Sequence, residues 1–167
     1  MMKLELKNIK VCKWASEETH CYQAVVYVNG KPAIEVSNEG HGGGDSQWAI
    51  DSNNRTIVDE VNTWCEKTLP KWKGHGNKMY PTDLEIWCGE QVNNYLTQKE
   101  LKRLFTRDLK SKILFVENDK LQSLSWKKCK VLTEAHLKYF KDKYPQRNAL
   151  NFMPKDKAIA IYSKYIG

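Results

Sequence analysis

The residues best suited to chemistry stand in one glycine-rich stretch, 36–48, which holds four of the nine glycines in this chain of 167 residues. Glycine adopts positive φ and lets other atoms approach the backbone closely, at an entropic cost on folding. Histidine side chains can act as acids or bases near neutral pH, and the nearby carboxylates of Asp45 or Glu39 can orient the ring of His41. His41 and Asp45 are therefore the candidate catalytic pair if the protein is an enzyme.

The same stretch can bind an anion through its backbone N–H groups. Its glycines fall at 40, 42, 43 and 44, so neither the dinucleotide-binding pattern G-x-G-x-x-G nor the phosphate loop G-x-x-x-x-G-K-[ST] is present. The candidate ligand-binding residues here are Gly42, Gly43, Gly44 and Ser46. The alternative is a surface connection in which Asn38, Asp45 and Ser46 make the hydrogen bonds of turns.

A second loop, 71–81, combines glycine, proline and lysine with aromatic rings. A ring flanked by lysines can stack on a base while the ammonium groups meet phosphate. Trp72 and His75 are therefore candidates for nucleotide contact. The alternative is that the loop carries these residues for solubility alone.

Positive charge is concentrated in the C-terminal part of the chain. The net charge is +7, but residues 1–98 hold 10 Lys/Arg against 13 Asp/Glu, while residues 99–167 hold 17 against 7. This asymmetry predicts an acidic partner, either a nucleoprotein or a nucleic acid or nucleotide; the alternative is a solubilising lysine-rich face. The candidate contacts lie on one helix face and after a hairpin: Lys99, Lys102, Arg103, Arg107, Lys127 and Lys128.

Other classes of site and location are disfavoured. The five cysteines form no C-x-x-C pair, and no H-x-x-x-H pair is present, so we expect no metal, no cofactor and no disulfide framework. No apolar run approaches the roughly 20 residues that span a bilayer. We therefore expect an intracellular protein without a membrane partner.

The N-terminal part is patterned for strands. Residues 4–11 alternate apolar and charged side chains with one slip of phase near Asn8, which predicts an antiparallel strand with a bulge. A second strand is predicted over 20–28. Asn29-Gly30 then marks a hairpin turn, because both central positions of a type I′ turn need positive φ, and 31–36 is the return strand.

The rest of the chain is patterned mainly for helices. The expected elements are a helix over 54–67, a helix over 83–96, a new helix at the capping box Thr97-x-x-Glu100, a hairpin over 113–126, and helices following Thr133 and Pro154. The fold class is therefore α+β: an N-terminal three-stranded antiparallel sheet packed on a helix, followed by a helical half with a second β-hairpin. We expect a single domain over 1–167, with a subdivision into a β-rich part, 1–82, and a helical, basic part, 83–167, left open.

Three segments, 16–22, 27–31 and 36–43, resemble the N-terminal part of small accessory proteins encoded by bacteriophages and prophages. Trp87-Cys88-Gly89-Glu90 and Ile113-Leu114-Phe115-Val116 are similar to that group too. The resemblance implies a context, because such proteins commonly act by binding, as inhibitors or sequestering agents aimed at host defence, anti-CRISPR proteins among them. It carries no catalytic residue across.

Together these observations favour a phage accessory protein in the cytoplasm of the bacterial host cell. We expect it to bind and inhibit or sequester a component of antiviral defence through its basic surface and its glycine-rich loop. Two alternatives stay open. One is an enzyme acting on a nucleotide or nucleic acid with His41 as acid–base, and the other is a DNA-binding regulator, although no helix-turn-helix signature stands out.

Overall fold

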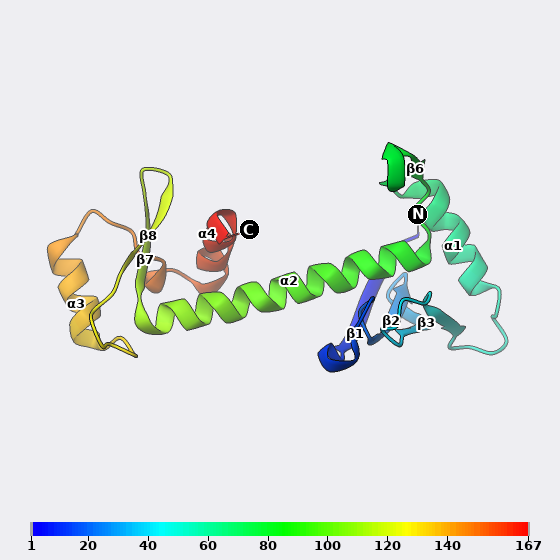
Figure 1. Cartoon of the computed structure of the whole chain (residues 1–167), viewed down its shortest axis with the longest axis horizontal. Coiled ribbons are helices and arrows are strands. Elements are labelled where there is room, and N and C mark those ends of the chain that lie inside the picture. Colours follow the sequence, from blue (N-terminus) through cyan, green and yellow to red (C-terminus); the bar gives the residue numbers. More distant parts are fainter. Residues whose placement is uncertain (1, 167) are drawn as a thin grey trace. The chain divides into compact units, whose positions relative to one another are not determined.

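The protein is described by a computed structural model that covers residues 2–166, with the side chain of His75 excepted. The chain divides into two compact units, unit 1 (Met1–Tyr95) and unit 2 (Leu96–Gly167). The boundary falls within the long helix α2 (Leu84–Ser111), so that its two halves belong to different units (Figure 1). The architecture is α+β, which confirms the expected class.

Unit 1 is built on a four-stranded antiparallel sheet with the order β1-β2-β3-β4. Its strands are β1 (Leu4–Val11), β2 (Tyr22–Val28), β3 (Lys31–Asn38) and β4 (Ser46–Ala49). The prediction of three strands is therefore wrong by one. The fourth strand was missed because its four residues are too few to show an alternating pattern, and it is defined by pairing with Ile34–Ser37 of β3.

Local signals in the first three strands are confirmed. The register between β1 and β2 shifts between Lys7 and Lys10, and Asn8 has φ of 56°, so the predicted bulge is present. Asn29 and Gly30 have φ of 51° and 81°, as a type I′ turn requires. These residues act through their own backbone preferences, which is why the sequence revealed them.

The core of unit 1 is formed by the sheet, by helix α1 and by the first turns of α2. Helix α1 (Ile57–Thr68) packs against β3 and β4, as expected for the predicted helix over 54–67. The buried apolar side chains come from strands and helices alike: Ala24, Val26, Ile34, Val36, Val61, Cys65, Leu84, Cys88 and Val92. A short 3₁₀ helix, η1 (Lys13–Ala15), joins β1 to β2, and a small hairpin of β5 (Trp72–Lys73) and β6 (Met79–Tyr80) encloses the 3₁₀ helix η2 (His75–Asn77).

Helix α2 is continuous over 28 residues, so the predicted break at Thr97 is wrong. Residues 96–99 contain no glycine or proline, and nothing there interrupts the backbone ladder of the helix. The T-x-x-E pattern therefore lies inside the helix, where Glu100 pairs with Arg103 along the same helix instead of capping a new one. Over residues 2–166, α2 included, the structure holds no helix that combines the length and the apolar character needed to cross a membrane.

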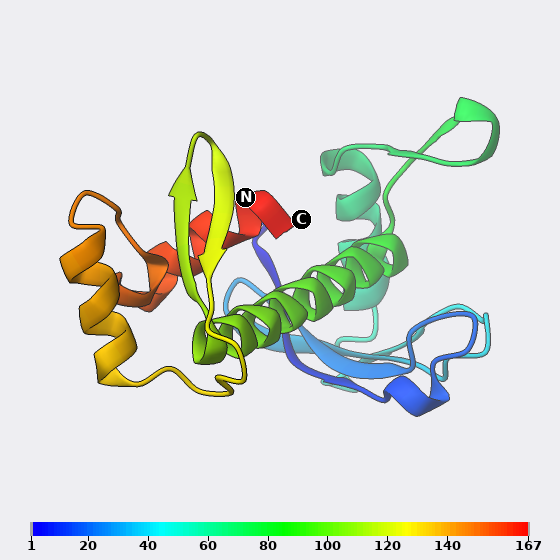
Figure 2. The ribbon, with the colours of Figure 1, turned by 60° about the vertical axis from the view of Figure 1, so that its left-hand side comes forward.

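Unit 2 is built around a β-hairpin formed by β7 (Ile113–Glu117) and β8 (Lys120–Leu124). The hairpin lies between two helices, α3 (Glu134–Lys143) and α4 (Lys155–Ile166), in Figures 1 and 2. The side chains of β7 are buried on both faces. Leu114 packs with Phe105 of α2 and Tyr162 of α4, whereas Ile113 and Phe115 pack with Phe140 of α3 and Ala149. A third short 3₁₀ helix, η3 (Leu150–Phe152), follows α3.

Candidate functional site

One buried side chain, Asn38 at the end of β3, holds the glycine-rich loop in place. Its Nδ2 donates to the carbonyl of Gly43 at 2.9 Å and to Oδ1 of Asp45 at 3.0 Å. Its Oδ1 accepts from the backbone N–H of Gly40 at 2.8 Å and from the hydroxyl of Thr19 at 2.7 Å. Asn38 is only 8% exposed, so these four bonds replace water and fix the loop conformation.

Gly40 is required by the close approach of two segments. Its φ is +91°, and a Cβ at this position would lie 2.1 Å from the carbonyl oxygen of Ala15. The carbonyl of Gly40 also accepts from the backbone N–H groups of Glu17 and Glu18, at 3.0 Å each. The loop is thus packed on the turn that follows η1, which no short-range signal in the sequence could show.

The surroundings of Gly42 and Gly44 are acidic. The N–H of Gly42 donates to the hydroxyl of Thr19 at 3.3 Å, and a Cβ on Gly42 would lie 2.2 Å from a carboxylate oxygen of Glu18. A Cβ on Gly44 would lie 3.1 Å from a carboxylate oxygen of Glu85. Two carboxylates beside the loop repel a phosphate, so this geometry disfavours an anion-binding loop.

Of the other predicted residues in the loop, Gly43 and Ser46 are open to solvent, whereas Asp45 is hydrogen-bonded within the protein. Gly43 has no heavy atom within 4 Å of an added Cβ, and Ser46 is exposed at the start of β4. Asp45 accepts hydrogen bonds from the phenol of Tyr22 and from Asn38. The alternative in which Asn38 and Asp45 serve the turn itself is therefore what the contacts favour.

Burial and nearby charge raise the pKa values of three groups around Asp45. Burial raises the pKa of Glu85, and the nearby charge of Asp45 raises it further. Burial is likewise the main reason that the pKa values of the Tyr22 phenol and the Cys88 thiol lie above their ordinary values. These shifts favour the neutral forms of both groups: the phenol donates a hydrogen bond to Asp45, and the thiol is fully buried in the core of unit 1.

His41 is paired with Glu17, not with Asp45. Its Nδ1 lies 3.2 Å from Oε2 of Glu17, and the two side chains are 61% and 67% exposed. Glu17 reaches His41 because the turn after η1 is bonded to Gly40, so sequence proximity pointed to the wrong carboxylate. A contact this open to water contributes little to stability.

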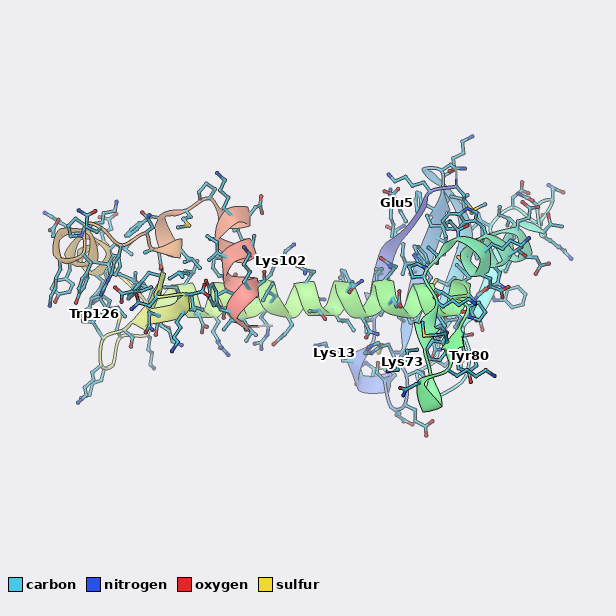
Figure 3. All side chains as sticks on the ribbon, turned by 90° about the horizontal axis from the view of Figure 1, so that it is seen from above. Glu5, Lys13, Lys73, Tyr80, Lys102 and Trp126 are labelled. Atoms are coloured by element: carbon cyan, nitrogen blue, oxygen red, sulfur yellow. The ribbon has the colours of Figure 1, made fainter. Side chains whose placement is uncertain are left out.

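The second predicted loop presents a pair of stacked rings. Trp72 and Tyr80 face each other across the β5–β6 hairpin with ring centroids 5.4 Å apart, and Trp72 remains 36% exposed. The ammonium of Lys78 lies 5.3 Å from the Tyr80 ring centroid. Figure 3 labels Lys73 and Tyr80 of this hairpin. The side chain of His75, the other predicted contact, lies outside the described residues.

The two predicted loops do not converge. The glycine-rich loop is bonded to the turn after η1, and η1 and the β5–β6 hairpin lie on opposite sides of the first turns of α2 in Figures 1 and 2. A single ligand site formed by both loops is therefore not supported. Each must be considered separately.

The cations of α2 differ in how far they are neutralised. Arg103 donates from Nη2 and Nε to the two carboxylate oxygens of Glu100 at 2.6 and 2.8 Å, and Arg107 lies 3.2 Å from Asp108. Lys99 and Lys102 are exposed on the same part of the helix; Lys102 is labelled in Figure 3. Lys102 is therefore better placed than the two arginines to meet an outside anion.

The predicted contacts Lys127 and Lys128 are exposed in the turn after β8. Lys128 has φ of 63°, and the N–H of Leu132 donates to the carbonyl of Lys110 at 2.8 Å. The segment that carries these two lysines is thus attached to the last turn of α2. They belong to the same unit as Lys102.

The charge asymmetry follows the structural division. Residues 96–98 are uncharged, so unit 1 holds 10 Lys/Arg against 13 Asp/Glu and unit 2 holds 17 against 7, a net +10. One unit is slightly acidic, and the other is strongly basic. The basic character is therefore a property of a folded unit, as well as of a stretch of sequence.

Among the described side chains, no three of His, Cys, Asp or Glu come together to hold a metal ion. No protein family model, curated protein or solved structure matches the chain.

Proposed function

We propose that this protein acts by binding, and that unit 2 contacts an acidic partner through its exposed lysines. We further propose that the partner is a nucleic-acid-bearing component of bacterial antiviral defence, which the protein inhibits or sequesters. The observation that carries the proposal is the net charge of +10 on unit 2. The bacterial setting rests on the sequence resemblance alone.

The position of the lysines supports contact with phosphate. Lys102, Lys127 and Lys128 are exposed, and within the described part of the chain none of them forms an ion pair. Exposed cations attract a polyanion over several ångströms and release its counterions on contact. A phosphate backbone is the partner that best matches such a surface.

The glycine-rich loop contacts the protein part of the proposed partner, not its phosphates. Its backbone is fixed by Asn38, and its flanking carboxylates disfavour phosphate, so it offers a rigid shape to a protein surface. Trp48 in β4, next to the loop, is 69% exposed and adds an apolar contact of the kind enriched at interfaces.

Binding to a 20-nucleotide single-stranded RNA at several salt concentrations tests the phosphate contact. In the triple variant Lys102→Gln, Lys127→Gln, Lys128→Gln, we expect weaker binding and a shallower dependence of log affinity on log salt, by up to about 2 if each lysine neutralises one phosphate. The substitutions should leave the fold unchanged because all three positions are exposed and glutamine keeps a long polar side chain.

The matched control removes three exposed lysines from unit 1, as Lys10→Gln, Lys13→Gln, Lys31→Gln. This variant has the same net charge as the first but keeps all the lysines of unit 2, so it should show the salt dependence of the unmodified protein. An equal loss in both triple variants would show that net charge alone matters, and unchanged binding in the unit 2 variant would overturn the proposed surface.

The link to defence is tested in cells. A bacterial strain whose immune system blocks a phage should become permissive when it expresses the protein, and less so when it expresses the unit 2 triple variant at the same level. Plating that stays blocked with the unmodified protein, across strains with different nucleic-acid-guided systems, would refute the proposed biological role while leaving the binding result intact.

A further inference from the structure

A pocket of about 370 Å³ opens in unit 2 between the end of α3 and η3. Its walls include two cations, an amide and two aromatic rings: Lys141, Arg147, Asn148, Tyr144 and Phe152. Pockets that hold small ligands begin at roughly 300 Å³, so the space suits a compact ligand. None of these residues was singled out by the sequence, because they come together only through the turn at 144–149.

The aromatic wall is open to a flat group. Phe152 is 38% exposed, although its ring also touches Phe140 of the core, with ring centroids 6.4 Å apart. The ammonium of Lys141 lies 4.4 Å from the centroid of the Phe152 ring. A large apolar ring left partly exposed under a cation can accept the face of a heterocycle when the flexible ammonium moves aside.

The two cations of the pocket wall, Arg147 and Lys141, differ in how far they are neutralised. Arg147 donates to Oε1 of Glu117 at 2.7 and 2.8 Å, and its guanidinium lies 4.4 Å from the Tyr144 ring centroid, so it is held and largely neutralised. Lys141, by contrast, has no ion-pair partner within residues 2–166. The pocket therefore keeps one uncompensated positive charge beside an aromatic face.

We propose that this pocket binds one nucleotide. The base stacks on Phe152, and the phosphate meets the ammonium of Lys141 and the side-chain amide of Asn148. The shared chemistry is a planar base joined to a phosphate, and its source is either a free mononucleotide or one nucleotide of a single strand. The site goes beyond the proposed function, because it involves none of Lys102, Lys127 and Lys128.

Titration of the full chain with each of the four ribonucleoside monophosphates, and separately with a hexathymidylate, tests the proposal. In Lys141→Gln and in Phe152→Leu, we expect the affinity for the bound probe to fall at least tenfold. Lys138→Gln removes the same charge from an exposed position of α3 outside the pocket, and it should bind as the unmodified protein does.

The results distinguish a free nucleotide from a nucleic-acid strand, and the pocket from the lysine surface of the proposed function. Binding of a monophosphate identifies a free nucleotide, whereas binding of the hexathymidylate alone identifies a strand. If no probe binds, or if either Lys141→Gln or Phe152→Leu binds as well as Lys138→Gln does, the pocket is not the proposed nucleotide site. Because the unit 2 triple variant keeps Lys141 and Phe152, it should retain monophosphate binding, so the pocket and the proposed surface can fail independently.

Discussion

The phenolic oxygen of Tyr162 donates a hydrogen bond of 2.8 Å to Oδ2 of Asp108, which ties α4 to α2 across 54 positions of sequence. Burial alone would raise the pKa of Asp108, but the bond from Tyr162 and the charges of Arg107 and Lys112 outweigh it, so the pKa is lowered. Burial, followed by the bond to Asp108, raises the pKa of Tyr162 to about 12. This pair links the core of unit 2 to its charged surface.

Replacing Tyr162 by Phe should destabilise unit 2 by about 1–2 kcal/mol, because the buried carboxylate of Asp108 loses its partner. The ring contact with Phe105 is kept, so the effect measures the hydrogen bond. Urea unfolding followed by circular dichroism gives the free energy of unfolding. The control is Tyr165→Phe, which removes an exposed bond to Asp119 and should change stability by less than about 0.5 kcal/mol; equal effects would contradict the prediction.

The stability contributed by Asp108 should depend on pH. Because its folded pKa is lowered, that stability is present above the unfolded value of about 4 and is lost as the pH falls through the folded value. Asp108→Asn should therefore be less stable than the unmodified protein at pH 7, with the difference shrinking below pH 4. Urea unfolding at pH 7, 5 and 3 measures it, and a gap of constant size would refute this assignment.

The stability contributed by Glu85 should depend on pH in the opposite direction. Its pKa is raised by burial and by Asp45, so its contribution is present below the unfolded value of about 4.3 and is lost as the pH rises through the folded value. Glu85→Gln should gain in stability relative to the unmodified protein at pH 7, and the gain should vanish below pH 4. Urea unfolding at pH 7, 5 and 3 measures this gain. A loss of stability in Glu85→Gln at pH 7 would contradict the prediction and show that the carboxylate stabilises the fold there.

Gly40→Ala should be more damaging than Gly30→Ala or Gly43→Ala. It combines a positive φ with a Cβ placed 2.1 Å from the carbonyl of Ala15, so we expect a loss of more than about 2 kcal/mol. Gly30→Ala has a positive φ in open space and should cost about 1 kcal/mol, and Gly43→Ala should be close to neutral. Thermal unfolding of the three variants gives the order, and a tolerated Gly40→Ala would mean that the loop is not held as described.

Asn38→Asp tests the centre of the loop. The substitution keeps the oxygen that accepts from Gly40 and Thr19, but it removes the donor to Asp45 and places a second carboxylate beside it. We expect a loss of about 2 kcal/mol or more at pH 7 and partial recovery relative to the unmodified protein below pH 4, where protonation restores a donor.

Unfolding at the two pH values measures this effect. The matched control is Asn53→Asp, at an exposed position in the turn before α1, which should be neutral at both pH values. A pH-independent loss in Asn38→Asp would show that packing, and not the pairing with Asp45, decides the effect.

The sequence by itself determined the features whose causes are local. Asn8 and the Asn29-Gly30 turn adopt positive φ because asparagine and glycine tolerate it, and alternating apolar residues fixed the first three strands. The concentration of lysine in the C-terminal part was visible in the same way. The α+β class followed from these patterns and from the helical periodicity.

Only the tertiary structure decided the features that depend on distant partners. The strand β4 exists through its pairing with β3, and the uninterrupted α2 overrode a capping pattern that is statistically typical of a helix start. His41 contacts Glu17 because the hydrogen bonds to the carbonyl of Gly40 hold the turn at Glu17, 23 residues before Gly40, against the glycine-rich loop. Sequence spacing gives no measure of such approaches, since they follow from how the strands and helices pack and where the chain returns.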